Sequence, residues 1–222
     1  MRWLSENCQA GMGYLERNVE KRLDPRELVE GAKSIISVAL NYYPPHKQRG
    51  GVPRFAYYAY GKDYHEVMWD KLNRLFSFIQ ERYPGTTGRC FSDTAPVLER
   101  FWAAQAGIGF VGKNTLLIIP GKGSYFFLGE IILDIELDYD RPIEENCGEC
   151  RRCLTSCPTN AIERPYWVNA NKCISYQTIE NRGAIPDDLK EGTSSWLFGC
   201  DDCQEVCPWN ERFARPTDEA RF

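Results

Sequence analysis

The organisation of this chain is set by one segment, Cys147-Gly148-Glu149-Cys150-Arg151-Arg152-Cys153-Leu154-Thr155-Ser156-Cys157-Pro158. Its first three cysteines are separated by two residues each, and a fourth follows after three residues and precedes a proline. Such a loop wraps three thiolates around one cubane iron–sulfur cluster, while the fourth thiolate points away toward a second cluster. The spacing therefore predicts iron–sulfur chemistry in the second part of the chain.

A second cysteine segment completes the pattern with the spacing of bacterial ferredoxins. It consists of Cys200-x2-Cys203-x3-Cys207-Pro208, with the single Cys173 upstream. If the fourth cysteine of each segment crosses to the other cluster, the eight thiols divide into two sets of four. One 4Fe–4S cluster then takes Cys147, Cys150, Cys153 and Cys207, and the other takes Cys157, Cys173, Cys200 and Cys203. Two structural zinc sites would also use all eight, but zinc ribbons usually carry two separated CxxC pairs.

Cysteine and histidine are scarce in the rest of the 222 residues. Of ten cysteines only Cys8 and Cys90 precede the block, and the only histidines are His46 and His65. Two histidines therefore leave little material for a histidine-rich metal site or a Ser/His hydrolase. The start lacks a signal-peptide core and no apolar stretch is long enough to cross a bilayer, so we expect a cytoplasmic protein without a membrane partner. In that reducing compartment, clustered cysteines bind metal more often than they form disulfides.

The sequence predicts an α+β fold in two domains, residues 1–138 and 139–222. Residues 34–40 are expected to form a buried strand, and a helix capped by Asp63 is expected to end before Pro84. A second helix is expected over 95–106, followed by a hairpin of strands 114–119 and 124–134. A net charge of −4 argues against a protein that binds nucleic acid through bulk electrostatics alone.

Six segments, read together, resemble the epoxyqueuosine reductase family, which completes queuosine in transfer RNA. These segments are Met12–Asn18, Gly31–Ile36, Ser92–Arg100, Gly109–Thr115, Cys173–Glu180 and Phe198–Gln204. The resemblance covers nearly the whole chain. Family members usually carry further residues before the equivalent of Met1, and many carry helical repeats after the cluster domain, so this chain resembles a family member shortened at both ends.

The resemblance implies a nitroreductase-like, cobalamin-binding domain followed by a ferredoxin-like domain with two 4Fe–4S clusters. It implies reduction of epoxyqueuosine to queuosine at the wobble position of tRNA, with two electrons and two protons consumed and water released. Electrons from an external donor would pass through the two clusters to cobalamin. The protein is expected to be a monomer.

Asp93 matches the family's proton donor. The competing interpretation is a helix N-cap, because an Asp just before a helix usually has that role. A cap stays ionised, whereas an acid must hold a proton for the departing oxygen. Arg100 follows seven residues later, so two helical turns would place it beside Asp93, near the lower face of the corrin, unless it is an ordinary surface arginine.

Further corrin contacts are expected from Tyr57 and Tyr58, in an aromatic stretch that could instead pack in the core. Lys113 and Asn114, at the start of a predicted strand, are expected to contact corrin amides. Asp63-Tyr64-His65 is interpreted as a helix cap. Cobalamin would therefore bind with its own base displaced and with no histidine ligand on cobalt.

Candidate RNA contacts are the basic pairs Arg151-Arg152 and Lys21-Arg22, together with Lys47 and Arg49, all of which could equally be solvated surface residues. The loop from Met12 to Asn18 is expected near the substrate entrance. Two other functions stay open at this point. One is a cobalamin-dependent small-molecule reductase like the reductive dehalogenases, and the other is a ferredoxin-type electron-transfer subunit.

Overall fold

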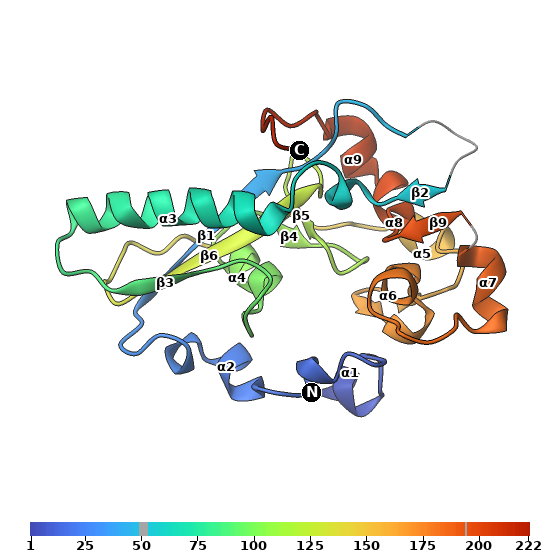
Figure 1. The fold of residues 1–222 in the computed structure, drawn as a ribbon, viewed down its shortest axis with the longest axis horizontal. Coiled ribbons are helices and arrows are strands. Elements are labelled where there is room, and N and C mark those ends of the chain that lie inside the picture. Colours follow the sequence, from blue (N-terminus) through green and yellow to red (C-terminus); the bar gives the residue numbers. More distant parts are fainter. Residues whose placement is uncertain (49–52, 194) are drawn as a thin grey trace.

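A computed structural model of the chain describes residues 1–48, 53–193 and 195–222 (Figure 1). The elements up to residue 133 are α1 (Arg2–Ser5), η1 (Gly13–Leu15), α2 (Val19–Leu23), η2 (Pro25–Glu27), β1 (Ser34–Asn41), β2 (Arg54–Phe55), η3 (Tyr57–Ala59), α3 (Tyr64–Arg82), β3 (Gly88–Phe91), α4 (Glu99–Gln105), β4 (Phe110–Val111), β5 (Leu117–Ile118) and β6 (Phe126–Leu133). The later elements are α5 (Arg152–Thr155), β7 (Ile162–Arg164), β8 (Trp167–Val168), η4 (Ala170–Lys172), α6 (Ile174–Ile179), α7 (Asp187–Thr193), β9 (Trp196–Phe198), α8 (Asp202–Glu205) and α9 (Pro208–Phe213). The structure confirms the mixture of helices and strands expected from the sequence.

An antiparallel sheet of three described strands, in the order β1-β6-β3, forms the centre of the first part of the chain. β6 is the middle strand, and seven of its eight residues are buried. β1 confirms the strand expected at 34–40, but the prediction that this strand is buried is wrong. Only Ser34 is buried and the other residues are half-buried, because β1 lies at an edge of the sheet.

The two faces of the sheet are covered by different helices, α3 above and α4 below in Figure 1. α3 begins as expected, because the Asp63 carboxylate accepts a hydrogen bond from the backbone N–H of His65. It buries an apolar stripe against β6, where Gly129 leaves room for Met68 and Leu72. A Cβ at residue 129 would lie 2.7 Å from the Met68 methyl carbon, so a side chain there would push α3 away from the sheet.

Two predictions about the middle of the chain are wrong. The helix expected at 95–106 begins only at Glu99, because Pro96 disfavours helical backbone in the residue before it. The expected hairpin does not form as a pair of strands, since β5 pairs with β4 while β6 pairs with β1 and β3. Only an isolated bridge between Ile119 and Gly123 closes the turn before β6.

Contacts across the expected boundary at 138/139 join the first part of the chain to the cysteine-rich part. β2 pairs in parallel with β9, and the Trp3 indole donates to the carbonyl of Val168 at 2.6 Å. The final residues also contact the first part of the chain, where the Thr217 N–H donates to the Tyr43 carbonyl at 2.9 Å. Among the described residues, no helix is both long and apolar enough to cross a membrane.

Candidate active site and cysteine sets

The cysteine block folds into two neighbouring groups of thiols. We call Cys147, Cys150, Cys153 and Cys207 the first set, and Cys157, Cys173, Cys200 and Cys203 the second set. The charges of Cys153 and Cys207 interact with those of other members of the first set. Within the second set, Cys173 interacts with Cys157, and Cys200 and Cys203 interact with Cys173. These contacts group the thiols in the same sets of four as the predicted division, whose ligand role stays a prediction.

Short helices direct backbone N–H groups at several of these sulfurs. Cys173 is the N-cap residue of α6 and Cys207 is the N-cap residue of α9, with Pro208 at its first position. Burial raises the pKa of both thiols, and backbone N–H groups just inside each helix act in the opposite direction. Such donors stabilise negative charge on a thiolate and on a cluster bound to it.

No three His, Cys, Asp or Glu side chains in the described part of the chain lie close enough together to hold a single metal ion. Four thiolates on one zinc ion stand close together, because each Zn–S bond is only about 2.3 Å long. A 4Fe–4S cubane spaces its thiolates more widely, because iron and sulfide atoms lie between them.

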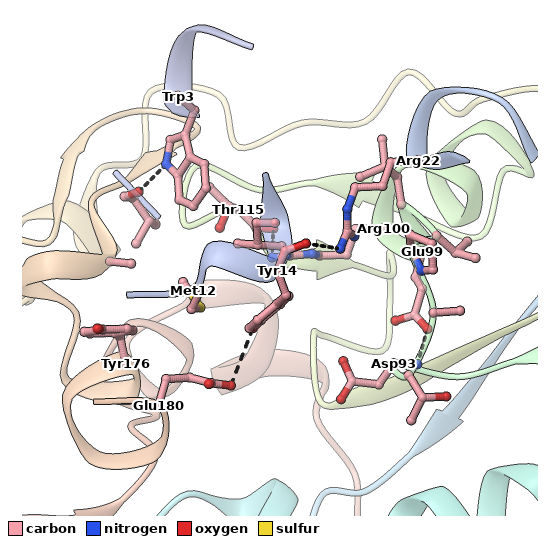
Figure 2. A pocket seen from close by; sticks show the side chains of 18 of the residues that line it. Trp3, Met12, Tyr14, Arg22, Asp93, Glu99, Arg100, Thr115, Tyr176 and Glu180 are labelled. Atoms are coloured by element: carbon pink, nitrogen blue, oxygen red, sulfur yellow. Dashed lines mark hydrogen bonds between the residues drawn. The ribbon is translucent and has the colours of Figure 1, made fainter. Parts of the chain in front are cut away.

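Two cavities meet beside the second set. The inner cavity, of about 460 Å³, is lined by all four thiols of the second set together with Tyr58, Tyr64 and Asp93. The outer cavity, of about 910 Å³, is lined among others by Trp3, Tyr14, Arg22 and Tyr176 (Figure 2). Asp93, Glu99, Arg100 and Thr115 line both. None of the first-set thiols is among the described residues that line either cavity.

Asp93 stands in the loop between β3 and α4 with a backbone φ of 59°. This left-handed conformation is uncommon outside glycine, and Asp and Asn tolerate it best. The backbone N–H of Asp93 donates to Oε1 of Glu99 at 2.5 Å, which fixes the loop against the start of α4. The side chain is 63% exposed and its Oδ2 accepts a hydrogen bond from the Tyr64 hydroxyl at 2.6 Å.

The capping interpretation of Asp93 is wrong. The N-cap residue of α4 is Leu98, five residues later, and the Asp93 carboxylate reaches no amide of that helix. The expectation that two helical turns separate Asp93 from Arg100 is also wrong, since Asp93 lies outside the helix. Arg100 nevertheless lines both cavities with Asp93, and its guanidinium donates to the Thr115 carbonyl at 2.8 Å.

Thr115 adds a second unusual backbone conformation at the same place, with a φ of 67°. A left-handed β-branched residue is strained, and such strain is kept where the surrounding structure holds it. Lys113 and Asn114, just before it, lie in a turn rather than at a strand start. The Lys113 ammonium donates to the carbonyl of Cys150 at 2.9 Å, while Asn114 lines the inner cavity. Their contacts to a corrin stay predictions.

The two predicted tyrosines have different positions. Tyr57 is 6% exposed, and its hydroxyl donates to Oε1 of Glu205 at 2.8 Å, so it packs in the core as the alternative interpretation held. Tyr58 is half-buried and lines the inner cavity, with its ring centroid 6.3 Å from that of Tyr64. Of the pair, only Tyr58 faces the space that a cofactor would enter.

Four residues around Asp93 were not identified from sequence: Tyr64, His65, Glu99 and Glu130. His65 was interpreted only through its helix cap, yet its ring Nε2 lies 3.5 Å from Oδ2 of Asp93. Glu130 offered a signal, since it is the one charged residue in the apolar strand Phe126–Leu133. Burial raises the pKa of both Glu99 and Glu130, and the nearby Glu99 raises the pKa of Glu130 further.

Several of the basic residues predicted to contact RNA already make contacts within the protein. Arg152 forms an ion pair with Glu211, and Lys47 lies over the Tyr43 ring at 5.6 Å. Arg22 lines the outer cavity, where its guanidinium donates to the Tyr14 carbonyl at 3.4 Å (Figure 2). Arg49 lies outside the described residues.

Comparisons with known proteins agree with this arrangement. Residues 146–210 match the 4Fe-4S double cluster binding domain, and residues 22–94 match the family described as Epoxyqueuosine reductase QueG, DUF1730. The epoxyqueuosine reductase of Cellulophaga algicola is 48% identical over 221 residues, which are 100% of this chain and 72% of that protein. The Escherichia coli K12 enzyme is 42% identical over 99% of this chain and 59% of its own length.

Solved structures of epoxyqueuosine reductases are similar to this chain over nearly its whole length. A selenomethionine-labelled epoxyqueuosine reductase has a TM-score of 0.89 at 35% identity, covering 99% of this chain and 60% of that chain. A complex with an epoxyqueuosine-modified tRNA-Tyr stem loop has a TM-score of 0.85 at 37% identity, covering 96% and 58%. This chain therefore spans about three fifths of the structures that it matches.

Proposed function

The chain belongs to the epoxyqueuosine reductase family of oxidoreductases, and from this premise we propose that it reduces epoxyqueuosine to queuosine at the wobble position of tRNA. The observation that carries the proposal is the position of Asp93, at the junction of a cavity lined by the second cysteine set and a larger cavity with aromatic and basic walls. A reduction that needs electrons and protons at one carbon–oxygen bond requires such a junction.

The proposed electron path runs from an external donor through two 4Fe–4S clusters. The match to a double cluster binding domain and the grouping of the thiols support four cysteine ligands per cluster. One electrostatic contact joins the sets, between Cys203 and Cys153, so the two clusters would lie next to each other. Since only the second set lines the inner cavity among the described residues, its cluster would be the one that delivers electrons there.

The cofactor proposed for the two cavities is cobalamin. Their combined size exceeds the range of about 300–1,000 Å³ found for drug-sized ligands, as a corrin requires. Tyr58, Asn114 and Arg100 would contact it, and when bound it supplies a cobalt centre that accepts electrons one at a time. No histidine is among the described residues that line either cavity, which supports binding without a histidine ligand. Displacement of the cofactor's own base belongs to the same proposal. The nitroreductase-like description of the domain belongs to the same proposal.

Asp93 is proposed as the acid that protonates the departing oxygen. Opening the epoxide and removing its oxygen consumes two electrons and two protons, breaks two C–O bonds, leaves a C=C bond and releases water. An alkoxide leaves poorly, so a positioned acid is needed. The Tyr64 hydroxyl donates a hydrogen bond to Oδ2 of Asp93. No hydrogen bond from the described residues reaches Oδ1, so the proton would be held there.

The outer cavity is proposed to receive the nucleobase of the anticodon. Tyr14 and Trp3 offer aromatic surfaces on which flipped-out RNA bases stack, and Arg17 and Arg22 offer positive charge for phosphates. The loop expected near the substrate entrance, Met12–Asn18, contributes Tyr14 and Arg17 to this wall. A tRNA substrate would place the protein in the cytoplasm, and the monomeric state stays a prediction.

Family membership over the whole chain favours this function over the two alternatives. A ferredoxin subunit would resemble its relatives in the cysteine block alone, whereas this chain matches epoxyqueuosine reductases over 99–100% of its length. The test is anaerobic incubation of the reconstituted, cobalamin-loaded protein with a reductant and an epoxyqueuosine-containing stem loop, followed by mass analysis of the nucleoside. Loss of one oxygen atom is expected, and only when cobalamin is present. An intact epoxide with fully loaded protein would refute the function.

A further inference from the structure

Glu130 is a carboxyl group completely enclosed by the protein. Its residue is 0% exposed, and neither side-chain oxygen has a hydrogen-bond partner in the described part of the chain. An ionised carboxylate without partners is very costly to bury, so the neutral acid is the stable form. A strand that needed only to pack would use an apolar residue here, as its neighbours Leu128 and Ile132 do on the same face of β6.

Two further buried polar atoms have no partner in the described part of the chain, the hydroxyl of Ser37 and the indole N–H of Trp102. Ser37 is the residue of β1 directly opposite Glu130, so both side chains lie on one face of the sheet with Cβ atoms about 5 Å apart. Trp102 belongs to α4, which contacts β1 and β6, and packs against the buried cluster that includes Ile132. Buried polar atoms without protein partners are usually bridged by ordered water.

Ser37 and Trp102 also line a third cavity, of about 790 Å³, which we call the edge cavity. It lies along β1 and is also lined by Asp138 and the 65% exposed Tyr139. None of the described residues that line it lines the inner cavity. Ser37 and Trp102 therefore place polar atoms between the edge cavity and the strand that carries Glu130, and no described residue lines both this cavity and the inner or outer cavity.

Glu99 lies at the other end of this group. It is the first residue of α4, and its Oε1 accepts the backbone N–H of Asp93 at 2.5 Å. The charged groups that act on its carboxyl are Asp93 in the loop, Arg100 on α4 and His65 on α3. Glu99 in turn acts on the Glu130 carboxyl. Glu130 lies opposite Phe91 of β3, two residues before Asp93, whose N–H is bonded to Glu99.

We propose that Glu130 and Glu99 form a proton relay that carries protons from the edge cavity beneath α4 to Asp93. The proposal rests on the reductase function, in which each turnover consumes two protons while the Asp93 carboxyl holds one. Asp93 gives its proton to the departing oxygen, and Glu99 returns a proton to the Asp93 carboxylate through a bridging water. Glu130 then reprotonates Glu99 and takes a proton from water in the edge cavity. The relay is needed because a nucleobase in the outer cavity closes the direct path from solvent.

The first test asks whether Glu130 is a neutral acid, independently of turnover. Infrared spectra of the holoprotein near neutral pH should show the C=O band of a buried protonated carboxylic acid. The band should shift in D₂O, vanish in Glu130→Gln, change in Glu99→Gln and persist in the control Glu81→Gln, an exposed residue at the far end of α3. If the wild-type spectrum lacks this band, the relay is refuted whether or not the protein is active.

The second test measures conversion of the epoxyqueuosine stem loop by the same proteins. Loss of a proton-transfer group costs about 10-fold or more in rate, so we expect at least that loss in Glu130→Gln, with substrate affinity unchanged. The wild-type rate should fall as rising pH ionises Glu99, and Glu99→Gln should lack this fall. Wild-type rates in both variants would refute the relay. If wild-type protein converts nothing, the reductase function fails separately, and the infrared band and its response to Glu99→Gln decide whether the two carboxyls are protonated and coupled.

Discussion

The hydroxyl of Tyr64 lies 2.6 Å from Oδ2 of Asp93, which joins the first turn of α3 to the loop after β3. The Tyr64 ring is held in turn by Phe127 of β6, with the two rings parallel within 5° and their centroids 4.3 Å apart. The orientation of the proposed acid thus depends on packing against the central strand.

Replacing Tyr64 with Phe should separate this anchor from the packing around it. The ring stacking is kept and only the hydroxyl is lost, so thermal stability should change by less than about 1 kcal/mol, the usual net value of one hydrogen bond. The turnover rate should fall about 10-fold, because the Asp93 carboxyl is no longer held toward the cavity. Kinetics with the stem loop and a thermal melt measure both. If turnover falls only because less of the variant is folded at the assay temperature, the anchoring role is contradicted.

The assignment of cysteines to clusters can be tested with pairs of alanine substitutions. Cys153→Ala and Cys207→Ala each remove a ligand of the first set, so either change, or both together, should leave about half of the iron. Combining Cys153→Ala with Cys157→Ala affects both sets and should remove nearly all of it. Iron and sulfide analysis after anaerobic reconstitution gives the answer. If the 153/207 double variant loses all its iron while the 153/157 variant keeps half, the division is wrong.

Arg54 is expected to stabilise the contact between β2 and the cysteine-rich part of the chain. Its guanidinium donates to Glu205 at 2.6 Å and to Asp202 at 3.2 Å, and it lies 3.8 Å from the centre of the Trp196 ring. Arg54→Ala should cost about 1–3 kcal/mol, because it leaves half-buried carboxylates without their partner. The control Lys190→Ala removes an exposed ion pair with Asp187 and should cost less than about 1 kcal/mol.

For a chain of this size, each kcal/mol corresponds to a shift of about 2–4 °C in the midpoint of thermal unfolding. The two variants should therefore differ clearly in a melting experiment on the cluster-loaded protein. Equal midpoints for Arg54→Ala and Lys190→Ala would show that the Arg54 contacts add nothing beyond a surface ion pair.

Stability should also depend on pH through Glu130. Burial raises the pKa of this carboxyl in the folded protein above its ordinary value of 4.5, so the folded state holds a proton that the unfolded state releases. Its stabilising contribution is complete below pH 4.5 and is lost as pH rises toward the folded-state pKa. Between roughly pH 5 and 8, the melting midpoint of the wild type should fall more steeply than that of Glu130→Gln. Parallel curves would contradict a neutral, buried Glu130.

The cysteine sets, α3 with its Asp63 cap and β1 could be predicted from sequence because each depends on local spacing. The site around Asp93 could not, because it depends on contacts between distant segments. Tyr64 and Asp93 are 29 residues apart, and the helix that was expected to start just after Asp93 begins only after Pro96 and Leu98. The hairpin prediction failed for the same reason. β6 pairs with β1 and β3, which are distant in sequence, and not with the strand that precedes its turn.

The strongest test of this account is the conversion of an epoxyqueuosine-containing stem loop by Asp93→Asn. Asparagine keeps the size of the side chain and can still accept the Tyr64 hydrogen bond, but it has no acidic proton to donate. With iron content, cobalamin absorption and stem-loop affinity equal to those of the wild type, turnover should fall by about 10²-fold or more. The control Asp188→Asn, on exposed α7, should react like the wild type. If Asp93→Asn forms queuosine at the wild-type rate, Asp93 is not the proton donor.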